Sequence, residues 1–271
     1  MSILRAAAKY QAICLGVFAL LLSTSIARAD DIAVTIATRP SVTQSFIANI
    51  QANPVAVVIL FPGGDGVFTA QANPDGSLTI TNKNFLIRTR QMFTAANIAT
   101  VLVDTPSDRP DGFDEAFRKS PEHAQDIADV LGWITQHTSV PVWLVGTSMG
   151  SISAAANAIA LQNKIAGVIL TSSVSITSRN APGGGIGSLN LAAITVPALV
   201  MDDTEDACRS SPPGNASVLA SRMTASPRTK SILIDGGDTP ISGPCDPLSY
   251  HGYLGVENQA VSAMINFIED K

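Results

Sequence analysis

The chain has few residues of the kinds that bind metal ions or nucleic acids. It contains three cysteines and three histidines among 271 residues, whereas a zinc site usually draws four ligands from such side chains. Charged residues make up 14% of the chain, the net charge is −5, and lysine and arginine form no cluster. An acidic chain without a basic patch does not suit the phosphate backbone. We therefore expect no bound metal ion and no nucleic-acid partner.

Long apolar runs are equally scarce, and the longest lies at the start of the chain. Arg5 and Lys9 precede a mostly apolar run at residues 12–22, and Ala27-Arg28-Ala29 follows it. This arrangement is typical of a secretory signal peptide with an A-x-A cleavage site. A membrane anchor fits less well, because about 20 apolar residues are needed to span a bilayer. We expect cleavage after Ala29, which leaves residues 30–271 as a single secreted or periplasmic domain without membrane contact.

Cysteine usage agrees with export. Cys14 leaves with the signal peptide, so Cys208 and Cys245 are the two that remain. An even pair in an oxidising compartment predicts one disulfide. Two free buried thiols are the alternative.

Short apolar strands alternate with helical patterns along residues 30–271. Residues 32–38 and 42–48 alternate apolar and polar side chains, which predicts two half-buried strands at an antiparallel edge. Continuous apolar runs predict buried strands at residues 56–61, 99–103, 140–145, 167–170, 198–201 and 231–234. Helical patterns cover residues 85–96, 121–137, 152–162 and 258–268. This alternation predicts an α/β fold with a mainly parallel central sheet and helices on both faces.

One pentapeptide carries a candidate nucleophile. Gly146-Thr147-Ser148-Met149-Gly150 fits the pattern G-x-S-x-G and lies between a buried strand and a helix of small residues. In that context it predicts a nucleophile elbow, a tight turn that lifts the serine hydroxyl above the sheet. Glycines two residues before and after the serine remove Cβ atoms that would collide with backbone. An ordinary turn with a solvated serine is the alternative, and Ser148 is the candidate.

A serine hydroxyl needs a general base, and one histidine, His251, follows the elbow in sequence. His123 and His137 lie on the helix before it, where we expect exposed surface positions. In the order serine, acid, histidine, the acid should follow a strand between Ser148 and His251. The strand at residues 198–201 ends in four candidates, Asp202, Asp203, Glu205 and Asp206.

Backbone N–H groups should stabilise the oxyanion of a tetrahedral intermediate. The residue after the nucleophile, Met149, supplies one donor, and the loop after an earlier strand supplies the other. That loop reads Phe61-Pro62-Gly63-Gly64-Asp65-Gly66. Gly64 is our choice for the second donor and Gly63 the alternative. A plain glycine turn is also compatible with the loop, and the chain has no G-x-x-x-x-G-K-[ST] phosphate motif.

Taken in order, the segments VVILFPGGDG, VWLVGTSMG, VPALVMDDTEDAC and SYHGY resemble the α/β-hydrolase fold superfamily. Among its members, the chain resembles serine esterases and dienelactone-hydrolase-like enzymes without a large cap domain. Members often carry H-G-x-x-D after the strand that bears the acid. Here Asp202 and Asp203 replace the His-Gly, so the resemblance implies Asp206 as the acid, with Asp202 as second choice. Pro62 replaces the common histidine of the oxyanion loop.

The resemblance implies ester hydrolysis through an acyl-enzyme, with a small-molecule ester as partner and no metal or organic cofactor. Ser148 would attack, His251 would transfer the proton and Asp206 would orient His251. A Cys208–Cys245 bridge would tie the acid loop to the histidine loop and pre-organise both side chains. An acyltransferase or peptidase with the same triad is an alternative, as is a non-catalytic binding protein on this fold. No feature of the sequence marks an oligomer interface.

Overall fold

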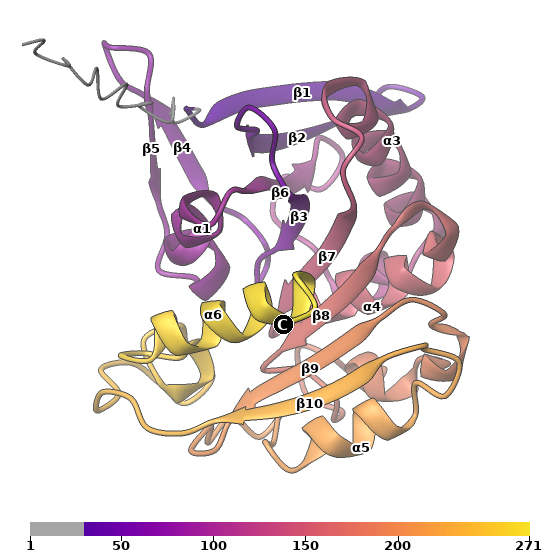
Figure 1. Cartoon of the computed structure of the whole chain (residues 1–271), viewed down its shortest axis with the longest axis vertical. Helices are drawn as coiled ribbons and strands as arrows, with labels where there is room; N and C mark the ends of the chain where they lie inside the picture. Colours follow the sequence, from indigo (N-terminus) through magenta and orange to yellow (C-terminus); the bar gives the residue numbers. More distant parts are fainter. Residues whose placement is uncertain (1–29) are drawn as a thin grey trace, which may run out of the picture.

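An eight-stranded sheet runs through the centre of the computed structural model (Figure 1), which describes residues 30–271. The predicted signal peptide and its cleavage site lie outside the described residues. The strand order is β1-β2-β6-β3-β7-β8-β9-β10. β1 and β2 are antiparallel, β2 is antiparallel to β6, and all pairs from β6 to β10 are parallel. The strands are β1 (Ile32–Arg39), β2 (Val42–Asn49), β3 (Ala56–Phe61), β6 (Ile98–Pro106), β7 (Val142–Thr147), β8 (Gly167–Thr171), β9 (Ala198–Asp203) and β10 (Thr229–Ile234).

The central strands are continuously apolar because both faces of the sheet are covered. In β3, alternate side chains enter two different cores: Val57, Ile59 and Phe61 join one, while Val58 and Leu60 join the other. A strand buried on both faces has no polar side to show, which explains the unbroken apolar runs in the sequence. The predicted mainly parallel sheet with an antiparallel edge is confirmed.

Helices cover each face of the sheet. α3 (Pro121–His137), α4 (Gly150–Ala160) and α5 (Asn215–Ser221) pack on one face, and α1 (Phe85–Ala95) and α6 (Glu257–Ile268) pack on the other. The Ser120 side chain caps α3 and Pro121 occupies its first turn, so this helix begins where its sequence favours a start. Every helix within residues 30–271 is too short or too polar to cross a membrane.

Two strands and two short α-helices of the structure are absent from the sequence-based prediction. The hairpin of β4 (Thr69–Ala72) and β5 (Leu78–Thr81) follows the glycine-rich loop, and α2 (Glu115–Arg118) lies between β6 and α3. The other short helix is α5. The turn sequence Asn73-Pro74-Asp75-Gly76 was a signal for the hairpin, but four exposed residues in β4 carry no apolar pattern.

His123 is buried, which contradicts the expected surface position. Its ring packs against Phe61, Phe113 and Phe117 and is 0% exposed. Burial, together with the charges of two nearby arginines, lowers the pKa of His123 to about 3, so the ring stays neutral. His137 is exposed, as predicted.

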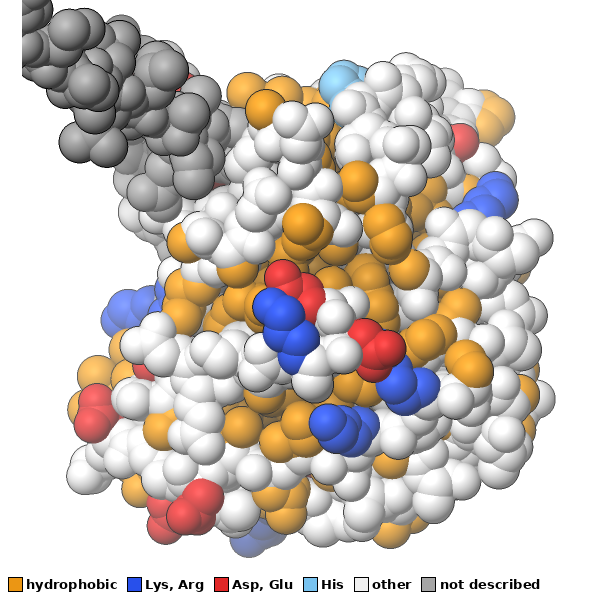
Figure 2. Space-filling view, viewed as in Figure 1, with side chains coloured by type: hydrophobic (Ala, Val, Ile, Leu, Met, Phe, Trp, Pro, Cys, Tyr) orange, Lys and Arg blue, Asp and Glu red, His pale blue; other side chains and the backbone are white. Residues whose placement is uncertain are grey.

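Charged side chains are sparse on the face drawn in Figure 2. Acidic and basic groups gather side by side near the centre of this view, where Figure 1 places the C-terminus. Two ion pairs belong to this part of the chain, Arg228 with Asp270 and Lys271 with Glu269. Opposite charges therefore offset each other there, and apolar side chains occupy much of the remaining face.

Candidate active site

The elbow around Ser148 is a strained turn that only glycine neighbours permit. β7 ends at Thr147, Ser148 has a φ of 52°, and α4 begins at Gly150. A Cβ on Gly146 would lie 2.3 Å from the Gly150 carbonyl oxygen, and a Cβ on Gly150 would lie 2.0 Å from the Phe61 carbonyl oxygen. Such a backbone conformation costs a non-glycine residue about 1–2 kcal/mol. The surrounding packing therefore holds Ser148 in an unfavourable conformation that presents its hydroxyl.

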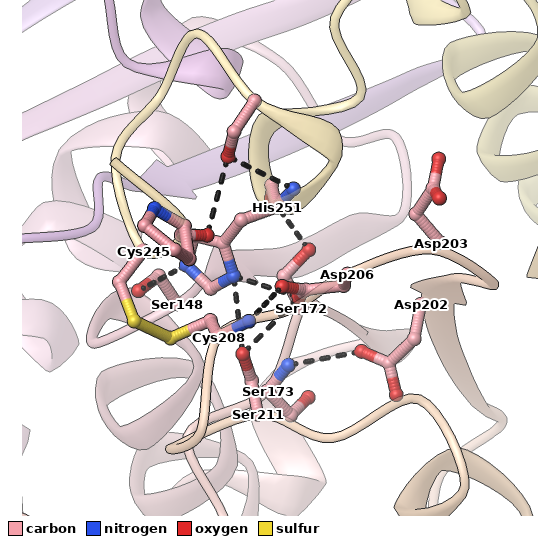
Figure 3. Close-up of polar contacts among 12 residues, drawn as sticks. Ser148, Ser172, Ser173, Asp202, Asp203, Asp206, Cys208, Ser211, Cys245 and His251 are labelled. Atoms are coloured by element: carbon pink, nitrogen blue, oxygen red, sulfur yellow. Dashed lines mark hydrogen bonds and ion pairs between the residues drawn. A yellow bond between two sulfur atoms is a disulfide. The ribbon is translucent and has the colours of Figure 1, made fainter. Parts of the chain in front are cut away.

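His251 lies between a serine and an aspartate (Figure 3). Its Nε2 is 2.9 Å from Ser148 Oγ, and its Nδ1 is 2.8 Å from Asp206 Oδ2. These distances fit a neutral ring that donates from Nδ1 to the carboxylate and accepts at Nε2 from the serine hydroxyl. The ring is buried, whereas Ser148 is half-buried. The arrangement can take a proton from a serine that a small molecule can still reach.

The Asp206 carboxylate is held by two donors besides His251. The backbone N–H of Cys208 donates to Oδ1 at 2.8 Å, and the Ser211 hydroxyl donates to Oδ2 at 3.2 Å. These two hydrogen bonds fix the orientation of the carboxylate beside the imidazole. Sequence reasoning missed Ser211, because a serine five residues beyond the acidic run carries no motif.

Ser211 also lies 3.0 Å from His251 Nδ1, but it lies on the acid side of the ring. Its side chain is buried, and its hydroxyl is engaged with Asp206. Ser148, on the opposite ring nitrogen, borders a cavity. Of the two serines beside His251, Ser148 is therefore the one placed to meet a substrate.

The other three acidic candidates point elsewhere. Asp202 accepts the Ser173 N–H at 3.2 Å, and Figure 3 shows Asp202 and Asp203 lying away from the imidazole. Burial raises the pKa of Asp202 well above its usual range, and the charges of Asp206 and Asp203 add to this rise. Burial likewise raises the pKa of Asp203 to about 6. Glu205 is exposed. The structure thus brings Asp206, not Asp202, to His251.

A disulfide joins the loop of Asp206 to the loop of His251. Cys208 and Cys245 are bonded across 37 residues (Figure 3). The predicted disulfide is therefore present. The histidine loop has a second attachment, because Ser172 Oγ donates to the His251 carbonyl oxygen at 2.8 Å. The disulfide and this hydrogen bond together anchor the histidine loop to the segments that follow β9 and β8.

The predicted oxyanion loop lies directly against the serine. A Cβ on Gly63 would come within 2.9 Å of Ser148 Cβ, so the close approach requires glycine there. The next residue, Gly64, lines the same cavity as Met149. The N–H groups of Gly64 and Met149 thus belong to residues that face a common space beside Ser148.

Arg118, which sequence reasoning missed, fastens this loop to a helix. One guanidinium nitrogen donates to the Gly64 carbonyl oxygen at 3.1 Å, and the other donates to Ser153 Oγ of α4 at 2.9 Å. The side chain is 1% exposed, and burial lowers the pKa of Arg118 to about 9. An arginine is rarely buried so fully without an ion pair. The buried Arg118 side chain therefore serves to hold the Gly64 loop against α4.

Two cavities meet at the oxyanion loop, and Gly64 and Asp65 border both. The larger has a volume of about 750 Å³ and lies on the Met149 side. The smaller has a volume of about 200 Å³ and lies on the side of Ser148 and His251. Among residues 30–271, no group of three or more His, Cys, Asp or Glu side chains is arranged to hold a metal ion.

Comparison with known proteins places the fold. No family model and no curated protein matches the sequence. Solved structures match at low identity. Est1E from Butyrivibrio proteoclasticus with bound ferulic acid is 11% identical with a TM-score of 0.59, covering 88% of this chain and 98% of that one. A dienelactone hydrolase from Anabaena variabilis is 14% identical with a TM-score of 0.58, covering 88% and 95%.

A third match is XC6422 from Xanthomonas campestris, described as a serine hydrolase without a lid. It is 15% identical with a TM-score of 0.55, and the match covers 87% of this chain and 95% of that one. Each of the three matches thus covers 87% or 88% of this chain and at least 95% of the other. The protein therefore has the α/β-hydrolase fold, and its structural neighbours include a dienelactone hydrolase and a serine hydrolase described as lacking a lid.

Proposed function

We propose that the protein is a serine hydrolase that cleaves carboxylic esters of small molecules through an acyl-enzyme. One observation carries the proposal: His251 joins the strained Ser148 hydroxyl to the Asp206 carboxylate, at 2.9 Å and 2.8 Å. A histidine linked to a buried acid is the group that activates a serine at neutral pH. The dienelactone hydrolase and the serine hydrolase XC6422 among the structural neighbours support the same class of chemistry.

The reaction would follow from this geometry in two steps. His251 Nε2 takes the hydroxyl proton of Ser148 as Oγ attacks the ester carbonyl carbon. The oxyanion accepts hydrogen bonds from the Gly64 and Met149 N–H groups. His251 then returns the proton to the alkoxide oxygen, which leaves as an alcohol, and the acyl group stays on Ser148. Water repeats the sequence and releases the acid, while Asp206 stabilises the imidazolium in both steps.

The proposal extends to where the protein works. The Cys208–Cys245 disulfide suits an oxidising compartment. Together with the signal-like N-terminus, it supports a secreted or periplasmic enzyme in which residues 30–271 form the mature domain. Expression in a signal-competent host, followed by N-terminal sequencing of the exported protein, should find Asp30 as the first residue. Retention of the first 29 residues would contradict this part of the proposal.

Labelling with a fluorophosphonate probe tests the activated serine. The oxidised wild type should be labelled, Ser148→Ala should lose the label, and His251→Ala should label far more slowly. Ser211→Ala is the matched control, because it removes a hydroxyl on the other side of the same ring and should still be labelled. A folded wild type that takes no label would overturn the proposal in favour of a binding role. Product analysis with alcohols, amines and water then separates hydrolysis from acyl transfer and peptide cleavage.

A further inference from the structure

The two cavities at the Gly64 loop differ almost fourfold in volume, about 750 Å³ against about 200 Å³, and Ser148 lines the smaller one. They lie on opposite sides of the Gly64–Asp65 loop, which borders both. An ester has two substituents on its reacting centre, the acyl chain and the alkoxy group. Once the carbonyl oxygen is placed between the Gly64 and Met149 N–H groups, each substituent must enter one of these two spaces.

Proton transfer decides which substituent goes where. The alkoxide oxygen receives its proton from His251 Nε2, so it must lie within hydrogen-bond reach of that atom. His251 and Gly252 line the smaller cavity, whereas neither lines the larger one. The alkoxy group therefore occupies the smaller cavity. The acyl chain is left with the larger cavity, whose wall includes Met149.

We propose that the substrates are esters of a bulky acid with a small alcohol. This inference rests on the proposed function and adds the substrate class to it. At the ~30 Å³ that one water occupies in the liquid, 200 Å³ holds about seven non-hydrogen atoms and 750 Å³ about 25. A methoxy or ethoxy group fits the smaller space, and an aryl-alkyl alkoxy group does not.

The walls of the smaller cavity are braced against expansion. Asn82 Nδ2 donates to the Val67 carbonyl oxygen at 3.1 Å, and its Oδ1 accepts the Asn84 N–H at 2.7 Å. Phe85 is buried at the start of α1, and Cys245 is fixed by the disulfide. Moving these walls outward to admit a larger group would break hydrogen bonds between wall residues or displace a core side chain. The size limit on the alcohol therefore belongs to the fold rather than to one loop.

The larger cavity is lined by apolar side chains and by charged or polar ones, among them Asp65, Asp114, Arg179 and Asn180. Phe113, Ala116, Met149 and Pro182 supply apolar surface from the segments after β6, β7 and β8. Glu115 and Lys119 in its wall form an ion pair, and Glu115 also accepts the Gly183 N–H at 2.6 Å. The charge of Glu115 is therefore already paired within the protein. The apolar part of this lining, in a cavity of this volume, suits an aromatic or branched acyl chain.

Two isomeric esters test the assignment directly. Methyl 4-phenylbutanoate and 3-phenylpropyl acetate have the same formula and the same two kinds of ester oxygen, but the bulky half is acyl in the first and alkoxy in the second. We expect kcat/KM for methyl 4-phenylbutanoate to be at least tenfold higher. An equal or reversed ratio would overturn the inference.

Two variants outside the proposed catalytic residues sharpen the test. Ala116→Trp, at an exposed position, should fill the larger cavity and lower kcat/KM for methyl 4-phenylbutanoate more than tenfold while leaving 3-phenylpropyl acetate nearly unchanged. Val67→Ala should widen the smaller cavity and raise kcat/KM for 3-phenylpropyl acetate. Equal effects of either variant on both esters would contradict the assignment.

Labelling of Ser148 separates this inference from the proposed function. If the probe labels Ser148 and the ratio of the two esters is equal or reversed, or neither ester is cleaved, the substrate class is wrong and the activated serine stands. If Ser148 takes no label and neither ester is cleaved, the proposed function fails and this inference fails with it.

Discussion

Asp202 and Asp206 lie four residues apart, but different groups donate hydrogen bonds to their carboxylates. Asp206 receives hydrogen bonds from Cys208 N–H, Ser211 Oγ and His251 Nδ1, whereas Asp202 receives the Ser173 N–H and is buried near the charges of Asp206 and Asp203. Asp206→Asn should lower kcat on the order of 10³–10⁴-fold, because the amide favours the wrong imidazole tautomer. Asp202→Asn should keep kcat within about threefold, and the opposite pattern in ester hydrolysis would reassign the acid.

Asp203 should make stability depend on pH. Its pKa is raised to about 6 in the folded protein by burial and by the charges of Asp206, Glu205 and Asp235, against about 3.9 in an unfolded chain. At pH values between these two pKa values, Asp203 is protonated in the folded state and ionised in the unfolded state. The contribution of Asp203 to the free energy of unfolding therefore becomes more favourable to the folded state as pH falls from 7 to 4.

The matched variant for this effect is Asp203→Asn, which keeps the Oδ1 acceptor used by the Glu205 N–H. It should raise the free energy of unfolding at pH 7.5 on the order of 1 kcal/mol, or about 2–4 °C in Tm for a domain of this size. At pH 4.5 the gain should shrink. Thermal melts of both proteins at the two pH values measure it, and a gain that is larger at pH 4.5 would contradict the assignment.

At the residue scale, sequence reasoning can single out a site residue where its chemistry leaves a local pattern. Ser148 has its glycines at fixed spacing, and His251 is the histidine after the elbow. Asp206 could be singled out among four acids only through the family resemblance, because propensity does not distinguish neighbouring carboxylates in a loop. Ser211 and Arg118 could not be found at all, since their partners depend on how distant loops pack.

At the element scale, the Gly64 loop depends on Arg118 for its attachment to α4. Arg118→Met removes the donors to the Gly64 carbonyl and to Ser153 while keeping much of the buried volume. Losing an oxyanion donor outright costs about 10²–10³-fold in kcat, so loosening the loop should lower kcat by roughly tenfold with a smaller change in KM.

The control for the loop attachment is Arg118→Lys. It keeps a charge, but a single ammonium cannot reproduce the forked contact to both partners, so it should restore kcat only in part. Steady-state kinetics on one ester, with circular dichroism to verify folding, provide the measurement. A folded Arg118→Met protein with wild-type kcat would show that the loop holds its position without the arginine.

The disulfide connects two elements that the chemistry needs together. Closing a loop of 37 residues should stabilise the protein by about 4 kcal/mol in the chain-entropy model. The double variant Cys208→Ser/Cys245→Ser should therefore lower both Tm and kcat, because the Asp206 and His251 loops lose their direct link. Treatment of the wild type with a reductant should reproduce both losses. A lower Tm with unchanged kcat would limit the bridge to a stabilising role.

The ends of helices and strands were predictable where the sequence marks them, and poorly predictable elsewhere. β3 and α3 agree with the prediction at both ends, since an apolar run and a Ser-Pro cap mark them. β6 extends three residues beyond the predicted strand because its end pairs with the antiparallel edge at Gln44. β4 and β5 form a separate two-stranded sheet, and every residue of β4 is exposed. The β4 sequence therefore carries no apolar pattern that would predict the hairpin.

At the scale of the whole molecule, the sheet separates two cores that share every central strand. Trp133 packs against the core on one face, beside Phe46, and Trp143 belongs to the core on the other face, beside Phe267. Because alternate residues of β3 enter the two cores, we expect neither core to unfold while β3 remains paired in the sheet. The two tryptophans are thus independent reporters of the two layers.

We expect residues 30–271, produced without the first 29 residues and oxidised, to unfold in one cooperative transition. Trp133→Phe leaves Trp143 as the reporter of one layer, and Trp143→Phe leaves Trp133 as the reporter of the other. Within each variant, the denaturation midpoints from tryptophan fluorescence and far-ultraviolet circular dichroism should coincide. Both variants are needed, because the loss of either ring changes stability by itself. If the midpoints separate in one variant, the layer that its tryptophan reports unfolds apart from the sheet, and residues 30–271 are not one cooperative domain.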